Sequence, residues 1–114
     1  MRKDAKVYIE DMLEGILKIE EYTSDVTEDE FYKNTLIQDA VFRRLEIIGE
    51  AVKSISAEIK DSHDEIPWKQ IAGMRDILIH QYSGVKLERV WIVVKRDIPD
   101  LKNKIADLKD AVEE

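Results

Sequence analysis

The sequence NTLIQDAVFRRLEIIGEAVKSISAEIK, residues 34–60, carries the strongest helical pattern of the chain. Its apolar residues recur at intervals of three, four and seven, as on a helix with one buried stripe. The stripe consists of Ile37, Val41, Leu45, Ile48, Val52, Ile55 and Ile59. We therefore expect a helix of about 25 residues here, the longest in the chain and the central one. Gly49 lies inside it, and we expect a neighbouring helix to approach closely at that point.

Two helical patterns precede this segment. Residues 3–22 place apolar side chains close to the three-four spacing of a helix. Thr27-Glu28-Asp29-Glu30 is a capping box, in which Thr27 caps a new helix and Glu30 reaches back to it. We expect this second helix to be short and either to continue or to bend at Asn34-Thr35.

Two more patterns follow it. Pro67 is suited to the first turn of a helix, and Ser83-Gly84 to its end. A last helix is expected from about Lys86 to the end of the chain. Pro99 removes a backbone donor from its middle and should kink or split it near Asp97-Ile98.

Composition supports a helical protein. The chain has 114 residues, 44% hydrophobic and 38% charged, with only four glycines and two prolines. We expect one domain, residues 1–114, with an all-α fold: an antiparallel bundle of four to five helices joined by short loops. The absence of cysteine and the presence of only two histidines argue against a metal site, and no cofactor is expected. No apolar run approaches the ~18 residues of a membrane span, and no signal peptide is recognisable, so a cytoplasmic location is expected.

The formal net charge is −7, and the acidity is concentrated at the N-terminal end, where residues 1–33 carry ten acidic and five basic groups. Affinity for nucleic acids rests largely on neutralising phosphates. An acidic chain is therefore a poor general nucleic-acid binder, and no DNA partner is expected. An RNA-directed function would need a local basic patch or a groove assembled from more than one subunit.

The segment RDILIHQY, residues 75–82, gathers the groups capable of phosphate chemistry. On a helix, Asp76 and His80 are four residues apart, so that the carboxylate can hydrogen-bond the imidazole. Arg75 and Tyr82 are seven apart and share a second face. An alternative interpretation is structural: Arg75 forms a surface ion pair with Asp76, His80 belongs to the core, and Tyr82 is a packed aromatic residue.

The segment from Arg75 to His80 resembles the signature of the HEPN superfamily, an arginine, a polar residue, three further residues and a histidine. The extension His80-Gln81-Tyr82 matches the longer form that is typical of HepT-like toxins. Residues 44–51, RLEIIGEA, resemble the central helix of that family. Residues 66–74, IPWKQIAGM, resemble its approach to the motif, and residues 90–99 its following helix. The resemblance covers nearly the whole chain.

This resemblance implies a HEPN-like helical homodimer that acts as a metal-independent endoribonuclease toxin on RNA. It implies that Arg75 and His80 are catalytic, with Asp76 at the variable position of the motif. It also implies a type VII-like pair with a cognate nucleotidyltransferase antitoxin, which would neutralise the toxin by adenylylating Tyr82. The alternative is a non-catalytic HEPN module that partners a nucleotidyltransferase or binds a nucleotide.

The chemistry of these residue types agrees with the resemblance. Cleaving RNA without a metal requires a base for the 2′-hydroxyl, an acid for the leaving 5′-oxygen and positive charge on the phosphate. His80 can serve as base or acid, Arg75 offers a planar fork to two phosphate oxygens, and Asp76 can orient the imidazole. One histidine does not easily make both proton transfers, and Arg75 and His80 lie about 140° apart around an ideal helix. Either the helix distorts at the motif, or two copies meet across a two-fold axis, and a homodimer meets both requirements.

Overall fold

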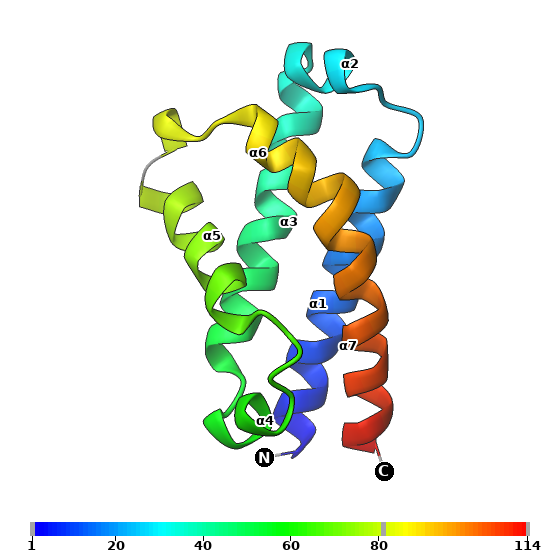
Figure 1. Ribbon diagram of the computed structural model, residues 1–114, viewed down its shortest axis with the longest axis vertical. Helices are drawn as coiled ribbons and strands as arrows, with labels where there is room; N and C mark the ends of the chain where they lie inside the picture. Colours follow the sequence, from blue (N-terminus) through cyan, green and yellow to red (C-terminus); the bar gives the residue numbers. More distant parts are fainter. Residues whose placement is uncertain (1, 81, 114) are drawn as a thin grey trace.

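The computed structural model describes the backbone of residues 2–80 and 82–113 and the side chains of residues 5–80 and 83–113. Four long helices build the molecule, each antiparallel to the next along the chain (Figure 1). They are α1 (Arg2–Thr23), α3 (Thr35–Ser54), α5 (Trp68–His80) and α7 (Ile98–Glu113). The described residues contain no strand. The predicted all-α antiparallel bundle is confirmed.

Short helical segments connect the long helices. The short helix α2 (Glu28–Lys33) joins α1 to α3, and α4 (Ala57–Ser62) precedes α5 at the opposite end of the bundle (Figure 1). A 3₁₀ turn, Tyr82–Gly84, follows α5, and α6 (Leu87–Ile92) then crosses the end of the bundle. None of the helices in the described part of the chain has the length and apolar character required to cross a membrane.

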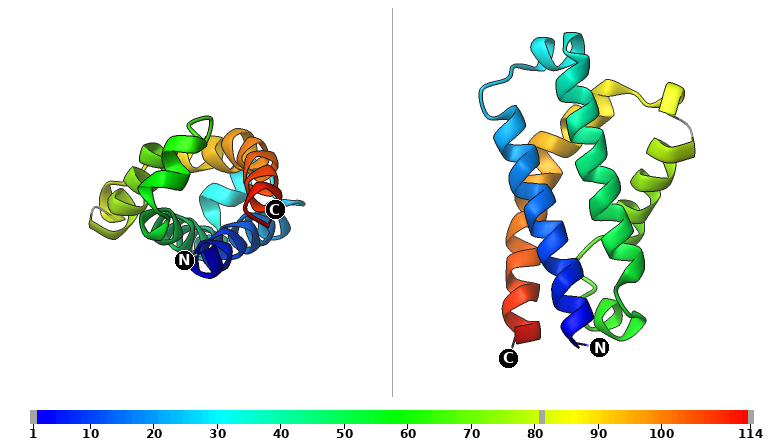
Figure 2. Two further views of the ribbon diagram at one scale, coloured as in Figure 1. Left: turned by 90° about the horizontal axis from the view of Figure 1, so that it is seen from below. Right: turned by 180° about the vertical axis from the view of Figure 1, so that it is seen from behind.

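The helix α3 is the centre of the bundle, as its apolar stripe predicts. It packs against α1 on one side and α5 on the other, and α7 packs against α1 (Figure 2). The stripe supplies the core: Val41, Leu45, Ile48, Val52 and Ile55 are buried. The other helices contribute further fully buried side chains, among them Ile9, Met12, Ile16, Ile19, Phe31, Leu78, Ile105 and Leu108.

The prediction of one helix over residues 34–60 is wrong at its C-terminal end, because α3 ends at Ser54. Ile55 adopts an extended conformation, with φ −78° and ψ 139°, and the Ser56 side chain accepts a hydrogen bond from the Ile59 N–H at 3.3 Å. Ser56 thereby caps a separate helix, α4. This local hydrogen bond favours the start of a new helix over the continuation of α3. At 20 residues, α3 is also shorter than the 22-residue α1, so it is not the longest helix.

The predicted capping box at the start of α2 is confirmed. The Glu30 N–H donates to Thr27 Oγ1 at 3.1 Å, and the Thr27 N–H donates to the Glu30 carboxylate at 2.9 Å. Of the two alternatives at Asn34, the chain bends: Asn34 ends α2, and its side chain accepts from the Ile37 N–H at 3.1 Å to cap α3. The bend turns the chain back along α1 and sets the antiparallel α1–α3 pair.

The predicted interruption ahead of Pro99 is also confirmed. Between α6 and α7 the chain forms a π-helix, Val93–Asp97, in which the Ile98 N–H donates to the carbonyl of Val93, five residues before it. Pro99 has no N–H with which to continue the regular ladder, so the wider turn accommodates it. The segment from α6 to α7 consequently bends. The helix α6 crosses the end of the bundle, and α7 runs down beside α1, on the opposite side of the bundle from α5 (Figure 1).

Candidate active site

The motif helix α5 approaches α3 most closely at Gly49. A β-carbon at this position would collide with Cβ of Arg75, and it would lie 2.8 Å from Arg75 Cγ and 3.3 Å from the carbonyl oxygen of Ile71. The expectation that a neighbouring helix comes close at Gly49 is confirmed. The missing side chain of Gly49 is what allows the stem of Arg75 to lie against α3.

Arg75 is held between two carboxylates. Its Nη1 lies 3.2 Å from Asp76 Oδ1, and its Nη2 lies 3.6 Å from Glu50 Oε1 on α3. The side chain is only 22% exposed. Its Nε is buried and has no hydrogen-bond partner among the described residues. The guanidinium is thus fixed in position, although its donors are not all satisfied by the residues that the structure describes.

Asp76 joins the motif to α3 rather than to the imidazole. Lys53 on α3 donates to Asp76 Oδ1 at 2.6 Å, and Arg75 donates to the same oxygen. The hydrogen bond from Lys53 and then that from Arg75 hold the pKa of Asp76 below its ordinary value, so this carboxyl is ionised at neutral pH. Both Asp76 and His80 are described, and no hydrogen bond joins their side chains. The contact that their spacing allows is therefore not made here.

His80 is the last residue of α5, and its side chain is exposed. The interpretation that His80 belongs to the core is wrong. The helix is regular from Trp68 to His80, so Arg75 and His80 remain about 140° apart around α5 and about 7.5 Å apart along its axis. A single chain does not bring them together, and the motif does not distort to do so.

The expectation of a helix continuing to Ser83-Gly84 is wrong in one respect. The helix α5 ends at His80, and Tyr82 begins the 3₁₀ turn, so Tyr82 does not share an unbroken α-helical face with Arg75. A tighter 3₁₀ turn is a common way for a helix to end. The side chain of Tyr82 lies outside the described residues.

Two apolar side chains of α5 are exposed next to the motif, on different sides of the helix. Ile77 is 44% and Ile79 41% exposed, and they lie about 160° apart around the helix axis. Gly73 lies four residues before Ile77, and a β-carbon added there would meet nothing within 4 Å. Isolated glycines inside helices usually have a packing reason. Among the described residues, no neighbour provides that reason for Gly73.

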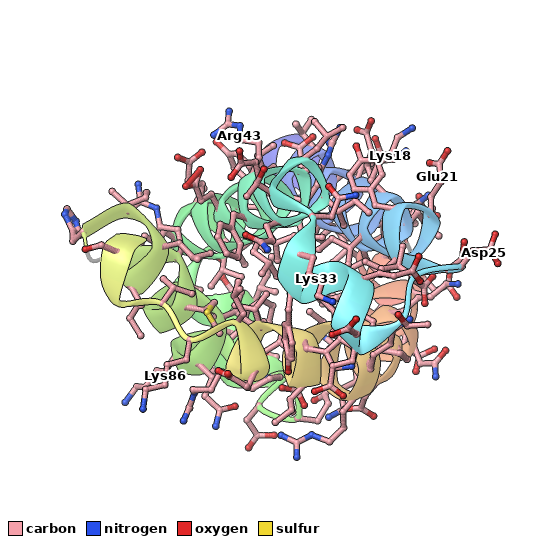
Figure 3. All side chains as sticks on the ribbon, turned by 90° about the horizontal axis from the view of Figure 1, so that it is seen from above. Lys18, Glu21, Asp25, Lys33, Arg43 and Lys86 are labelled. Carbon is pink, nitrogen blue, oxygen red and sulfur yellow. The ribbon has the colours of Figure 1, made fainter. Side chains whose placement is uncertain are left out.

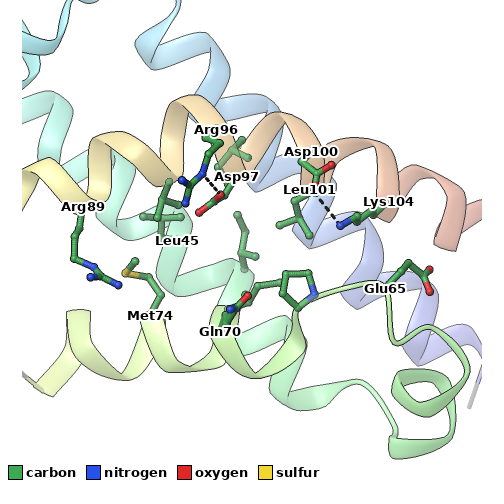
Figure 4. A pocket seen from close by; sticks show the side chains of 15 residues that line it. Leu45, Glu65, Gln70, Met74, Arg89, Arg96, Asp97, Asp100, Leu101 and Lys104 are labelled. Carbon is green, nitrogen blue, oxygen red and sulfur yellow. Dashed lines mark hydrogen bonds and ion pairs between the residues drawn. The ribbon is translucent and has the colours of Figure 1, made fainter.

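A groove of about 450 Å³ separates α5 from the α6–α7 segment (Figure 4). Leu45 and Ile48 of α3 form part of its apolar lining, and Arg89, Arg96 and Lys104 lie along one wall. Arg96 pairs with Asp97 at 3.0 Å and Lys104 with Asp100 at 2.9 Å. On the α5 wall, Ile71 lies about 180° from His80 around the helix. The groove is therefore separate from the exposed histidine.

Basic side chains are dispersed at the end of the molecule that carries α2. Figure 3 shows Lys33 on α2, Arg43 on α3 and Lys86 ahead of α6 at separate places on this end. Lys33 pairs with Asp29 at 3.0 Å, and Arg43 with Glu46 at 3.5 Å. These cations do not form the continuous basic patch that RNA binding by one chain would need.

The described residues contain no group of three or more histidine and acidic side chains placed to hold a metal ion. The second histidine, His63, lies before α5, with Nδ1 3.6 Å from Glu65. It is remote in sequence from the motif and faces Glu65 rather than His80.

Two positions of the site were missed in the sequence, Glu50 and Lys53. Both lie on α3, three residues apart, and they reach the motif only because α3 packs against α5. The available signal was Gly49, which marked the approaching helix but not the charges that flank it.

The chain is similar to known proteins over almost its whole length. A family model described as "Ribonuclease HepT-like" matches residues 12–108. The "Probable ribonuclease HepT" of Thermococcus cleftensis is 47% identical over 109 residues, which cover 96% of this chain and 99% of that protein. The "Gamma-glutamylcyclotransferase and putative RNase" of Methanocaldococcus jannaschii is 51% identical over 113 residues, 99% of this chain. The chain spans about half (51%) of the length of this second relative. No solved structure matches the chain.

Proposed function

Because the chain belongs to the HepT-like ribonuclease family, we propose that it is a metal-independent endoribonuclease that cleaves RNA by attack of a 2′-hydroxyl. The observation that carries the proposal is the pair on α5: a guanidinium fixed against α3 at Arg75 and an exposed imidazole at His80. These supply the charge and the proton-transfer group that cleavage needs.

In this reaction a base removes the proton of the 2′-hydroxyl, and the 2′-oxygen forms a bond to phosphorus. The bond from phosphorus to the 5′-oxygen breaks, and an acid donates a proton to that oxygen. The products are a 2′,3′-cyclic phosphate and a free 5′-hydroxyl. Imidazoles serve as base and acid, and Arg75 donates N–H groups to the phosphate oxygens, on which charge accumulates.

The active enzyme is proposed to be a homodimer in which two α5 helices face each other. Arg75 and His80 do not meet in one chain, and the two proton transfers are divided between two histidines when two chains associate. The exposed Ile77 lies on the same side of α5 as Gly73 and within about 60° of His80, so it supplies apolar surface for this contact, and Gly73 permits close approach of a second backbone. A glycine inside a helix costs about 1 kcal/mol relative to alanine, which the contact would offset.

We expect Ile77→Asp to convert a dimer into a monomer and to abolish RNA cleavage, because a charge would be buried in the apolar contact. Sedimentation at micromolar concentration and RNA cleavage in the presence of EDTA measure the two effects. Ile92→Asp is the matched control, since Ile92 is 45% exposed but lies on α6. An inactive wild-type protein, or an active monomer, would contradict the proposal.

Regulation is proposed to occur at Tyr82, as in a type VII-like toxin–antitoxin pair. A nucleotidyltransferase antitoxin would transfer adenosine monophosphate from ATP to the tyrosine oxygen, with release of pyrophosphate and the hydroxyl proton. The backbone of Tyr82 begins the turn that follows His80, so the added phosphate would lie near the motif. It would compete with RNA for Arg75, and its nucleoside would occupy the space of the substrate.

Co-expression with a cognate nucleotidyltransferase tests this regulation. We expect the intact mass to increase by one nucleoside monophosphate, growth arrest to cease, and Tyr82→Phe to remain both unmodified and toxic. Tyr22→Phe, at the end of α1, should behave as wild type. Neutralisation of Tyr82→Phe by the partner's catalysis would contradict the mechanism.

Two observations favour the second candidate, a non-catalytic module that binds a nucleotidyltransferase or a nucleotide. Arg75 is paired with Glu50 and Asp76, and the chain carries a net charge of −7. Both reduce attraction for an RNA phosphate. A stable complex with the nucleotidyltransferase, formed by a chain that does not cleave RNA, would favour this second candidate.

A further inference from the structure

Four charged side chains alternate in sign across the contact between α3 and α5. Lys53 lies 2.6 Å from Asp76, Asp76 lies 3.2 Å from Arg75, and Arg75 lies 3.6 Å from Glu50. Lys53 and Arg75 contact the same oxygen, Asp76 Oδ1. Lys53 lies on α3 and precedes Asp76 by 23 residues, so only the packing of α3 against α5 brings it to the motif.

Stability does not explain this arrangement well. The side chains of Lys53 and Asp76 are 42% and 47% exposed, and ion pairs with this exposure contribute little to folding. Arg75 Nε remains buried without a partner among the described residues, so the cluster is not a closed network that only joins two helices. The lysine does, however, change the electrostatics of the motif.

Asp76 follows Arg75 directly and, alone, would cancel its charge. A carboxylate without another partner can accept both N–H groups of a guanidinium fork, in the geometry that a phosphate also requires. Lys53 occupies the oxygen that Arg75 contacts, and it adds a positive charge. With Lys53 the four side chains, Glu50 included, carry a net charge of zero, whereas without it they would carry −1.

We propose that Lys53 is a positioning residue of the active site: by binding Asp76, it keeps that carboxylate from neutralising Arg75 and so keeps the guanidinium available to an RNA phosphate. This inference rests on the proposed ribonuclease function. It assigns a role to a residue outside the motif, and it explains how a chain with Asp76 and Glu50 beside the arginine avoids a net negative charge at the proposed phosphate site. The low pKa of Asp76, whose largest cause is Lys53, agrees with the arrangement.

The first test is a double-mutant cycle on RNA cleavage. We expect Lys53→Met to lower kcat/KM about tenfold, mainly through KM, as for the loss of one charge a few ångströms from a partly exposed site. Lys53→Arg should retain most of the activity. Asp76→Asn in the Lys53→Met background should restore it, because the carboxylate that needs compensation is then absent. A merely structural lysine would not be rescued in this way.

The matched control is Lys33→Met. Lys33 forms a comparable exposed pair with Asp29 at 3.0 Å on α2, away from the motif. Its replacement should leave cleavage unchanged, and both lysine variants should melt within a few degrees of wild type. Equal cleavage by wild type and Lys53→Met, or a double variant as impaired as Lys53→Met, would overturn the inference.

A second readout does not depend on RNA. The carboxyl carbon of Asp76 is titrated by NMR in the wild-type protein and in Lys53→Met, where Arg75 and Glu50 remain as charged neighbours. We expect the pKa of Asp76 to rise in the variant, because its strongest hydrogen bond is lost. An unchanged pKa would overturn the inference even if the chain cleaves RNA. Equal inactivity of wild type and His80→Ala would instead overturn the ribonuclease function, while the titration still tests Lys53.

Discussion

Replacing His80 by alanine is expected to reduce RNA cleavage by about 10²–10⁴-fold, the usual effect of removing one positioned acid or base. The fold should not change. His80 is exposed at the last residue of α5, and its side chain makes no hydrogen bond or ion pair with the described residues, so its removal leaves neither a cavity nor an unpaired buried group. The measurements are kcat/KM on RNA and the thermal melting curve.

The matched control is His63→Ala. It removes the only other histidine, whose Nδ1 lies 3.6 Å from Glu65 and which does not belong to the motif helix. We expect it to cleave RNA at the wild-type rate after correction for any unfolded fraction. Full cleavage by His80→Ala would contradict the assignment of His80, and an equal loss in both variants would indicate an effect on folding rather than on proton transfer.

The helical bundle could be predicted because its signals are local. The apolar stripe of α3, the capping box at Thr27 and the proline at position 99 each act within a few residues, and each appears in the structure. The end of α3 could not be predicted in the same way. The stripe runs through Ile55 to Ile59 without a break, while the cap at Ser56 depends on a backbone bend that the stripe does not reveal.

The candidate site was predictable only in part for a related reason. Spacing places Arg75 and His80 on one helix, and the structure has both on α5. The partners of Arg75 and Asp76 on α3, Glu50 and Lys53, cannot be found from spacing, since their contacts depend on how two helices pack. The groove between α5 and α7 was missed for the same reason, because its lining comes from three separate segments.

Gly49→Ala is expected to destabilise the protein by about 1–3 kcal/mol and to impair RNA cleavage in the molecules that remain folded. Alanine is the better helix former by about 1 kcal/mol, but overpacking opposes this gain. The new methyl group would collide with Arg75 Cβ. A β-carbon is bonded to the backbone and cannot rotate away, so α5 itself must shift, and the guanidinium shifts with it.

Gly15→Ala is the matched control, because Gly15 also lies at a close contact with a neighbouring helix. There the new methyl group would meet Cγ1 and Cδ1 of Ile48, at 2.8 and 3.1 Å, which are flexible side-chain atoms that can move. Denaturant unfolding measures the free energy of each variant, and kcat/KM is corrected for the folded fraction. We expect Gly15→Ala to lose some stability with normal cleavage by the folded molecules, whereas Gly49→Ala loses both. Normal cleavage by folded Gly49→Ala would mean that the position of Arg75 against α3 does not matter for the reaction.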